Sequence, residues 1–144
     1  MASEHDLSSW VRSNMTVDDS SIMMTHKESV SRLVSLSNDG KVILLKDRKL
    51  FSSRQLVVLY LLGKLFAKVA NYSTSRAAVN SEIAYELGVP KGTVGRCLME
   101  LREMGHVRPS QDEGNELLPS AIPAVLEELL LAGNSDGKDT TTRD

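Results

Sequence analysis

The 144-residue sequence contains a single cysteine, which excludes internal disulfides and any zinc site built from several cysteines. Its three histidines, His5, His26 and His106, lack the spacing of metal ligands. Aromatic residues make up only 4%, too few for a platform on which single-stranded bases stack. We therefore expect no metal and no cofactor.

Recognisable catalytic motifs are also missing. Ser, His and Asp are present, but no pattern brings them together. The segment 92–95, Gly-Thr-Val-Gly, lacks the Lys-Ser/Thr end of a phosphate-binding loop. We expect a protein that is not an enzyme and has no catalytic residues.

Long apolar runs are absent as well. The most apolar stretch, 56–62, is far shorter than the roughly 20 residues that a membrane-spanning helix needs. The first six residues include acidic side chains where a signal peptide has a basic region. We expect a cytoplasmic protein without membrane contact.

Net charge is close to zero, at -2, which excludes a histone-like polycation. The charges are nevertheless unevenly distributed along the chain. Residues 1–40 carry -3, residues 41–76 carry +7, residues 77–108 carry 0 and residues 109–144 carry -6. The basic charge is concentrated in one quarter of the sequence, so the total alone does not exclude a nucleic-acid partner.

Composition divides the chain into three parts. Residues 1–28 are rich in Ser and Asp and are predicted to form a flexible arm with one short helical turn at 6–11. Residues 29–132 hold the apolar patterns of one domain. Residues 133–144 contain no apolar side chain and are predicted to be a disordered tail.

The domain begins with a predicted hairpin and a long helix. Two β-branched and Leu-rich runs, 30–36 and 41–46, flank the turn sequence Ser-Asn-Asp-Gly at 37–40. Ser52 or Ser53 can then cap a helix over 54–70. Because that helix is apolar on more than one stripe, we expect it to be buried in the domain centre or against another subunit.

A pair of short helices is predicted around Gly88. Asn80 can cap the first helix, and Gly88 can end it in the left-handed conformation. Pro90 suits the entry to a second helix at 91–104. The crossing residue, Ala84, is small, and apolar residues can join the two helices: Ile83, Leu87, Val89, Val94, Cys97, Leu98 and Leu101. We interpret Cys97 as a core residue rather than a redox switch, because its spacing matches this apolar face.

This layout resembles the winged helix-turn-helix domains of bacterial and archaeal transcription regulators, most closely over 81–94 and overall across about 53–131. The resemblance implies a wing hairpin, with strands near 104–108 and 116–118. It also implies a closing helix at about 123–132, which in related regulators often joins the dimer interface. The expected fold is mainly α with small β-hairpins (α+β), a three-helix winged core with an added N-terminal hairpin and a C-terminal helix.

In the family, the second helix lies in the major groove, and its N-terminal residues reach base edges. The resemblance therefore implies that Arg96 can pair with guanine, that Thr93 can bond a base or phosphate and that Lys91 meets phosphate. Lys91 and Arg96 could instead be solvated charges on an exposed helix. The candidate DNA-binding residues are Lys91, Gly92, Thr93, Gly95, Arg96, Arg102, Asn80 and Arg76.

Two features depart from the family pattern. Gly92 and Gly95 have no side chain with which to read bases, and Gly95 lies inside the predicted helix. Asp112, Glu113 and Glu116 place negative charge on the wing, where it would repel phosphate. Either the wing is held away from the duplex or the domain binds a protein.

The first functional hypothesis is a double-stranded-DNA-binding transcription regulator. It would act as a homodimer through the helix 54–70, the closing helix or the hairpin 30–46. The alternative is a winged-helix protein–protein interaction module that does not bind DNA. A third hypothesis is an antitoxin or plasmid-partition accessory whose N-terminal arm folds on a partner.

Overall fold

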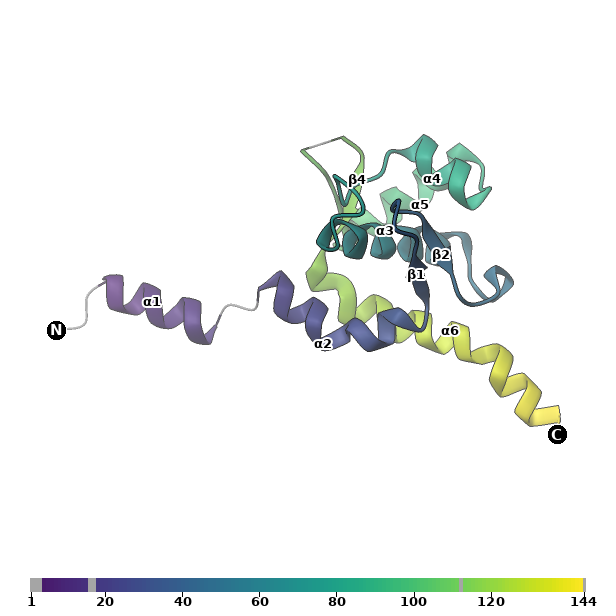
Figure 1. The fold of residues 1–144 in the computed structure, drawn as a ribbon, viewed down its shortest axis with the longest axis horizontal. Coiled ribbons are helices and arrows are strands. Elements are labelled where there is room, and N and C mark those ends of the chain that lie inside the picture. The colour runs from purple at the N-terminus through teal and green to yellow at the C-terminus, as the bar shows by residue number, and fades with distance from the viewer. Residues whose placement is uncertain (1–3, 16–17, 112, 144) are drawn as a thin grey trace.

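The computed structural model describes residues 4–15, 18–111 and 113–143, and within them the chain is α+β (Figure 1). Six α-helices are joined by two antiparallel two-stranded hairpins and two short 3-10 turns. None of the described helices is long and apolar enough to cross a membrane. In chain order the elements are α1 (Glu4–Asn14), α2 (Asp19–Ser31), β1 (Val34–Leu36), β2 (Val42–Leu44), η1 (Arg48–Leu50), α3 (Ser53–Val69), α4 (Asn80–Leu87), α5 (Lys91–Glu103), β3 (Val107–Pro109), β4 (Asn115–Leu117), η2 (Pro119–Ala121) and α6 (Ile122–Arg143).

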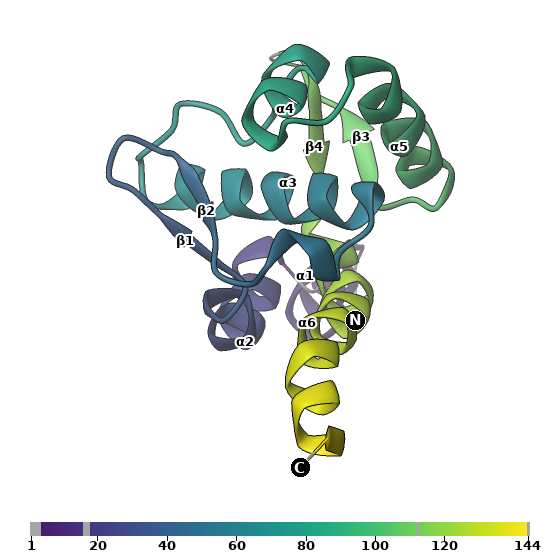
Figure 2. The same cartoon turned by 90° about the vertical axis from the view of Figure 1, so that its right-hand side faces the viewer.

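The long helix α3 occupies the centre of the fold. Its start is the predicted capping site: the Ser52 hydroxyl accepts from the Gln55 N–H, and the Gln55 side chain accepts from the Ser52 N–H. Ten of its 17 residues are buried. The helices α4 and α5 with the β3–β4 hairpin lie on one side of α3, and α2 and α6 lie on the other (Figures 1 and 2). Elements of the same chain therefore cover α3, as predicted for a helix in the domain centre.

The predicted N-terminal hairpin is present with shorter strands. Val34 pairs with Leu44 and Leu36 with Val42. The first run was expected to start at residue 30, but α2 continues to Ser31 and leaves only three residues for β1. The hairpin packs against α3.

The N-terminal region differs from the predicted flexible arm in being helical over most of its described length. The Asp18 side chain accepts from the Ser21 N–H and caps α2. Two turns apart, Met23 and Val30 are buried, and α2 packs against α6. The sparse apolar residues of this Ser-rich stretch did not reveal that face. Residues 1–3 and 16–17 of the predicted arm lie outside the described residues.

The closing helix is present but extends beyond residue 132, through most of the segment predicted to be disordered. Its buried stripe, formed by Ile122, Val125, Leu126 and Leu129, lies in its first turns. The remainder projects from the body of the molecule as far as Arg143 (Figure 1). A helix nucleated by packed turns propagates at one hydrogen bond per added residue, so composition alone did not define its end.

Close packing of the hairpin on α3 generates the first prediction. A Cβ added at Gly63 would lie 2.5 Å from Val42 Cγ1 and 2.7 Å from Val42 Cγ2. Valine is stiff at χ1 and cannot swing away, so Gly63→Ala should lower the free energy of unfolding by about 1–3 kcal/mol in a denaturant titration. Adding Val42→Ala should recover part of that loss.

The matched control is Gly95→Ala in α5. Its added Cβ would meet only Asn80 Nδ2, at 3.6 Å, an ordinary contact. Because alanine is favoured over glycine in a helix interior, this change should raise the free energy of unfolding by up to about 1 kcal/mol. Equal effects of the two substitutions would contradict the packing assigned to Gly63.

Candidate nucleic-acid interface

A tight turn joins α4 to α5. Gly88 has a φ of 66°, the left-handed conformation predicted for it, and its N–H donates to the Ala84 carbonyl. The Val89 N–H donates to the same carbonyl at 3.2 Å, and the Val89 side chain is buried. This turn orients α5 against α4, so the geometry expected around Gly88 is confirmed.

Asn80 does not cap α4, contrary to the prediction. It is the first residue of the helix, and the cap position belongs to Val79, which makes no side-chain cap bond. The Asn80 amide instead lies beside α5, 3.6 Å from where a Cβ of Gly95 would be. The side chain of Asn80 therefore faces the neighbouring helix, and Gly95 lies partly beneath it rather than on the open surface.

Apolar residues join α4 and α5 as predicted. Cys97 is one of them and is 2% exposed, so the core interpretation is confirmed. Burial raises the pKa of its thiol, which lowers the fraction of reactive thiolate. The other buried residues of this pair are Ile83, Leu87, Val94, Leu98 and Leu101.

The opposite face of α5 carries open positive charge. Lys91, Gly92 and Arg96 are exposed, and Thr93 is partly exposed. Within the part of the chain that the structure describes, neither Lys91 nor Arg96 forms an ion pair. Pro90 occupies the cap position without a side-chain cap bond, so the first N–H groups of α5 are open to an anion.

The other two candidate arginines bond inside the fold. The Arg102 Nη1 donates to Asn115 Oδ1 at 3.0 Å and ties α5 to β4. The Arg76 Nη2 lies 2.7 Å from Glu116 Oε2, and Arg76 Nη1 lies 3.7 Å from Asp19 Oδ2. Arg102 and Arg76 thus differ from Lys91 and Arg96, whose charged groups contact no carboxylate among the described residues.

Glu116 is a buried carboxylate that binds two arginines. Its side chain is 8% exposed, and its Oε2 accepts from Arg76 and, at 3.1 Å, from Arg108 Nη2. Burial alone would raise the pKa of Glu116, but hydrogen bonds from the two guanidinium groups outweigh burial and hold that pKa below its ordinary value.

This pairing changes the interpretation of the acidic hairpin. Glu116 presents no open negative charge, and Glu113 remains exposed. Asp112 lies outside the described residues. Arg108, absent from the predicted set, lies directly opposite Glu116 in the β3–β4 register and is half-exposed. Opposite charges at facing strand positions could have indicated this pair from the sequence once the hairpin register was known.

Residues 41–76, which we call the basic block, supply several cations that bind the α4–α5 pair. Lys64 Nζ lies 3.2 Å from Glu82 Oε2, and the Tyr60 hydroxyl also donates to that carboxylate. Arg54 Nη1 lies 3.5 Å from Glu100 Oε1. Two acidic side chains of α4 and α5 are therefore matched by cations from α3.

A further cation of the block lies at the turn itself. The Arg48 guanidinium donates to the Leu87 carbonyl in the last turn of α4, where positive charge complements the helix dipole. The next residue, Lys49, is exposed. Glu127 and Glu128 belong to α6, whose axis lies across α3 from α5 (Figure 2). Glu128 lines a hollow with Leu101 and Met104 and so lies nearer the C-terminal end of α5 than its start.

Among the described residues, no group of three or more His, Cys, Asp or Glu side chains is placed to hold a metal ion. No family model, curated protein or solved structure matches this chain.

The Glu116 cluster generates a pH prediction. Because the pKa of Glu116 is lowered in the folded protein, its stabilising contribution is present above the unfolded pKa of about 4.5 and is lost as pH falls through the lower folded value. Glu116→Gln should lower the free energy of unfolding by about 1–3 kcal/mol at pH 7. It should also flatten the acid-side loss of stability in unfolding titrations below pH 4.5.

The control for this prediction is Glu127→Gln on the exposed surface of α6. It removes the same charge without touching the arginine pair, so its unfolding free energy should follow the unmodified protein at every pH. An acid-side profile of Glu116→Gln that matched the unmodified protein would refute the stabilising role of Glu116.

Proposed function

We propose that this chain binds double-stranded DNA as a winged helix-turn-helix transcription regulator and acts as a homodimer. The observation that carries the proposal is the charge pattern of α5. Among the described residues, Lys91 and Arg96 are exposed and form no ion pair, and residues 91–99 contain no carboxylate. Glu82 and Glu100 are matched by cations of α3, whereas Glu86 and Glu103 stay exposed. The charge of the N-terminal part of α5 therefore favours a polyanion.

In the proposed complex, α5 enters the major groove by its N-terminal half. Arg96 can donate two bonds to a guanine edge, and Lys91 and the open N–H groups at the helix start can bind phosphate. A Cβ at Gly92 would meet nothing within 4 Å, so this position is open to a close approach of the duplex. A twofold dimer would place the two α5 helices on half-sites about 34 Å apart.

The β3–β4 hairpin supports this proposal through Arg108. Arg76 and Arg108 share the Glu116 carboxylate, and Arg76 also lies 3.7 Å from Asp19, so Arg108 is the arginine of this cluster that no second carboxylate contacts among the described residues. Together with Ser110 and Gln111, these side chains line an open hollow of about 500 Å³. The half-exposed Arg108 is oriented by Glu116 and can meet a phosphate beside the groove.

A second candidate function is a protein-binding module. Tyr85 on α4 is 85% exposed, and Met99 on α5 is 49% exposed, so apolar groups lie among the polar side chains of the α4–α5 pair. Such side chains are enriched in protein–protein contacts. A partner bound in a defined ratio, together with no duplex affinity at low salt, would favour this candidate.

The DNA proposal predicts that the double variant Lys91→Ala/Arg96→Ala loses duplex binding in a gel-shift titration. Each phosphate contact adds about 0.9 to the slope of log affinity against log salt, because binding releases counterions. Removing a phosphate-binding Lys91 should therefore make residual binding less dependent on salt, and removing Arg96 should relax preference at a guanine position.

The matched control is Lys46→Ala/Lys68→Ala, which removes the same charge from exposed sites away from α5. Lys46 lies against α6, and Lys68 lies in the last turn of α3. This variant should keep its duplex affinity within about twofold. Equal binding by both double variants would refute the assignment of α5 as the DNA-reading element.

A further inference from the structure

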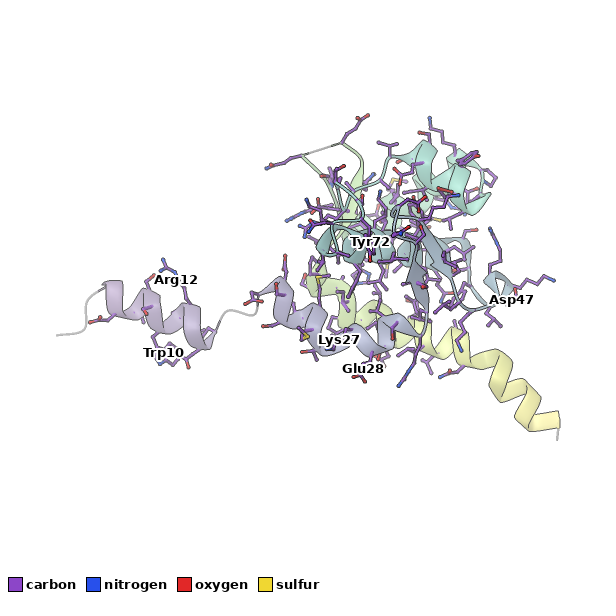
Figure 3. The ribbon with its side chains drawn as sticks, viewed as in Figure 1. Trp10, Arg12, Lys27, Glu28, Asp47 and Tyr72 are labelled. Carbon is purple, nitrogen blue, oxygen red and sulfur yellow. The ribbon has the colours of Figure 1, made fainter. Side chains whose placement is uncertain are left out.

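The first helix carries an apolar face that its own chain leaves uncovered. Leu7 is 62% exposed, Trp10 is 55% exposed and Met15, just after α1, is 68% exposed. Spacings of three and four residues about Val11 place these side chains on one side of the helix. Trp10 and Arg12 project from opposite sides of α1, which stands apart from the body of the molecule (Figure 3). Against the described residues of its own chain, Leu7, Trp10 and Met15 therefore form an apolar side of this segment that stays exposed.

A second apolar surface lies on the body, between α2 and the end of α3. One hollow of about 330 Å³ is lined mainly by Met23, Met24, Phe66 and Val69. An adjoining hollow of about 220 Å³ continues toward β1 and shares Phe66 and Lys27 with the first. We call the two hollows together the α2–α3 groove.

The α2–α3 groove and α1 match in length and in chemistry. Residues of α2 line the groove from Ser20 to Ser31, about 16 Å at 1.5 Å per residue, and the 11 residues of α1 have the same length. Lys27, at the junction of the two hollows, can place its ammonium over the indole of Trp10. Association of the two surfaces would bury apolar side chains of both, which is favourable.

We propose that α1 of each copy packs into the α2–α3 groove of a second copy, so that two chains exchange their first helices. This inference deepens the homodimer of the proposed function and rests on it. In such a dimer α1 of each copy contacts the α2–α3 groove of the other. Twofold symmetry makes these two contacts equivalent, so the dimer contains the same contact twice.

The geometry at the start of α2 identifies the second copy as the occupant. The backbone of Asp18 is extended, at φ -83° and ψ 161°, and its side chain caps the helix through Ser21. In the structure α1 lies beyond the start of α2, apart from the groove of its own chain (Figure 1). That groove is therefore open to α1 of a second copy, which can enter it without any change at the capped start of α2.

Arm exchange leaves the proposed DNA-reading helix uncovered. The helix α2 lies across α3 from α5 (Figure 2). A dimer joined through the α2–α3 grooves therefore keeps Lys91 and Arg96 of both copies open.

The test uses Trp10, the only tryptophan in the chain, as a probe of burial. Full-length protein is diluted over a wide concentration range, with tryptophan emission and sedimentation measured on the same samples. Emission should move to shorter wavelength as concentration rises, with the same midpoint as dimer formation. A concentration-independent emission, or a chain that stays monomeric throughout, would overturn the exchange.

Two variants separate the two halves of the contact. The arm variant Leu7→Ser/Met15→Ser and the groove variant Met24→Ser/Val69→Ser should each weaken dimerisation at least tenfold, with unchanged circular dichroism in the body of the fold. The control Met104→Ser, at a 46% exposed apolar position just after α5, should dimerise like the unmodified protein. A dimer of full strength in the arm variant would place the interface elsewhere.

Mixing the variants distinguishes exchange from docking within one chain. The arm variant has an intact groove and the groove variant an intact arm, so their mixture should form heterodimers with one of the two contacts. Intrachain docking predicts no such rescue. If exchange fails while duplex binding still depends on Lys91 and Arg96, only this inference is lost; if duplex binding fails while exchange holds, only the proposed function is lost.

Discussion

The fold depends on burying α3, a helix with apolar side chains around most of its circumference. No single partner can cover such a helix, so elements from both ends of the sequence pack on it. The helices α4 and α5 with the β3–β4 hairpin form one layer, and α2 and α6 form the other. Gly63 lets β2 approach the helix closely on a further side. Because two layers share one core helix, the surface of α5 is fixed relative to the rest of the molecule.

Polar contacts then determine which charges remain available. The cations of residues 41–76 look like one basic patch in the sequence, but Arg54, Lys64 and Arg76 are matched by carboxylates of the elements that pack on α3. Partly exposed pairs of this kind contribute modestly to stability. Their larger effect is on the surface, because they neutralise Glu82 and Glu100 near α5, where Lys91 and Arg96 form no ion pair among the described residues. The proposed DNA contact rests on this redistribution and not on the total charge of the basic block.

The apolar surface left over by folding points to a partner. The sequence offered α3, the closing helix and the first hairpin as dimer surfaces, and the structure buries most of the apolar residues of α3 in its own chain. Among the apolar surfaces that stay open are the side of α1 that carries Leu7 and Trp10 and the α2–α3 groove. A region expected to be a mobile arm is thus the element that carries the proposed exchange, on the side of α3 away from α5.

Features that depend on local backbone chemistry could be predicted before the fold was known. The cap at Ser52, the left-handed Gly88, the hairpin turn before Lys41 and the apolar spacing of α4 and α5 all involve residues a few positions apart, which a sequence pattern contains directly. The cap predicted at Asn80 was wrong because the helix already includes Asn80, which leaves the cap position to Val79. The helical face of α2 was missed because its two buried residues, Met23 and Val30, lie two turns apart in a polar stretch.

The pairing of charges and the coverage of apolar faces follow from contacts between elements that are distant in the sequence. Glu116 lies 40 residues from Arg76, and Arg54 lies 46 residues from Glu100, so their contacts depend on how the elements pack. The same holds for the exposed side of α1, whose helical spacing shows an apolar stripe but not whether the chain covers it. Backbone propensity acts over a few residues, whereas burial and ion pairing depend on the whole fold. The candidate interface depends on burial and ion pairing, so the sequence pattern alone could not define it.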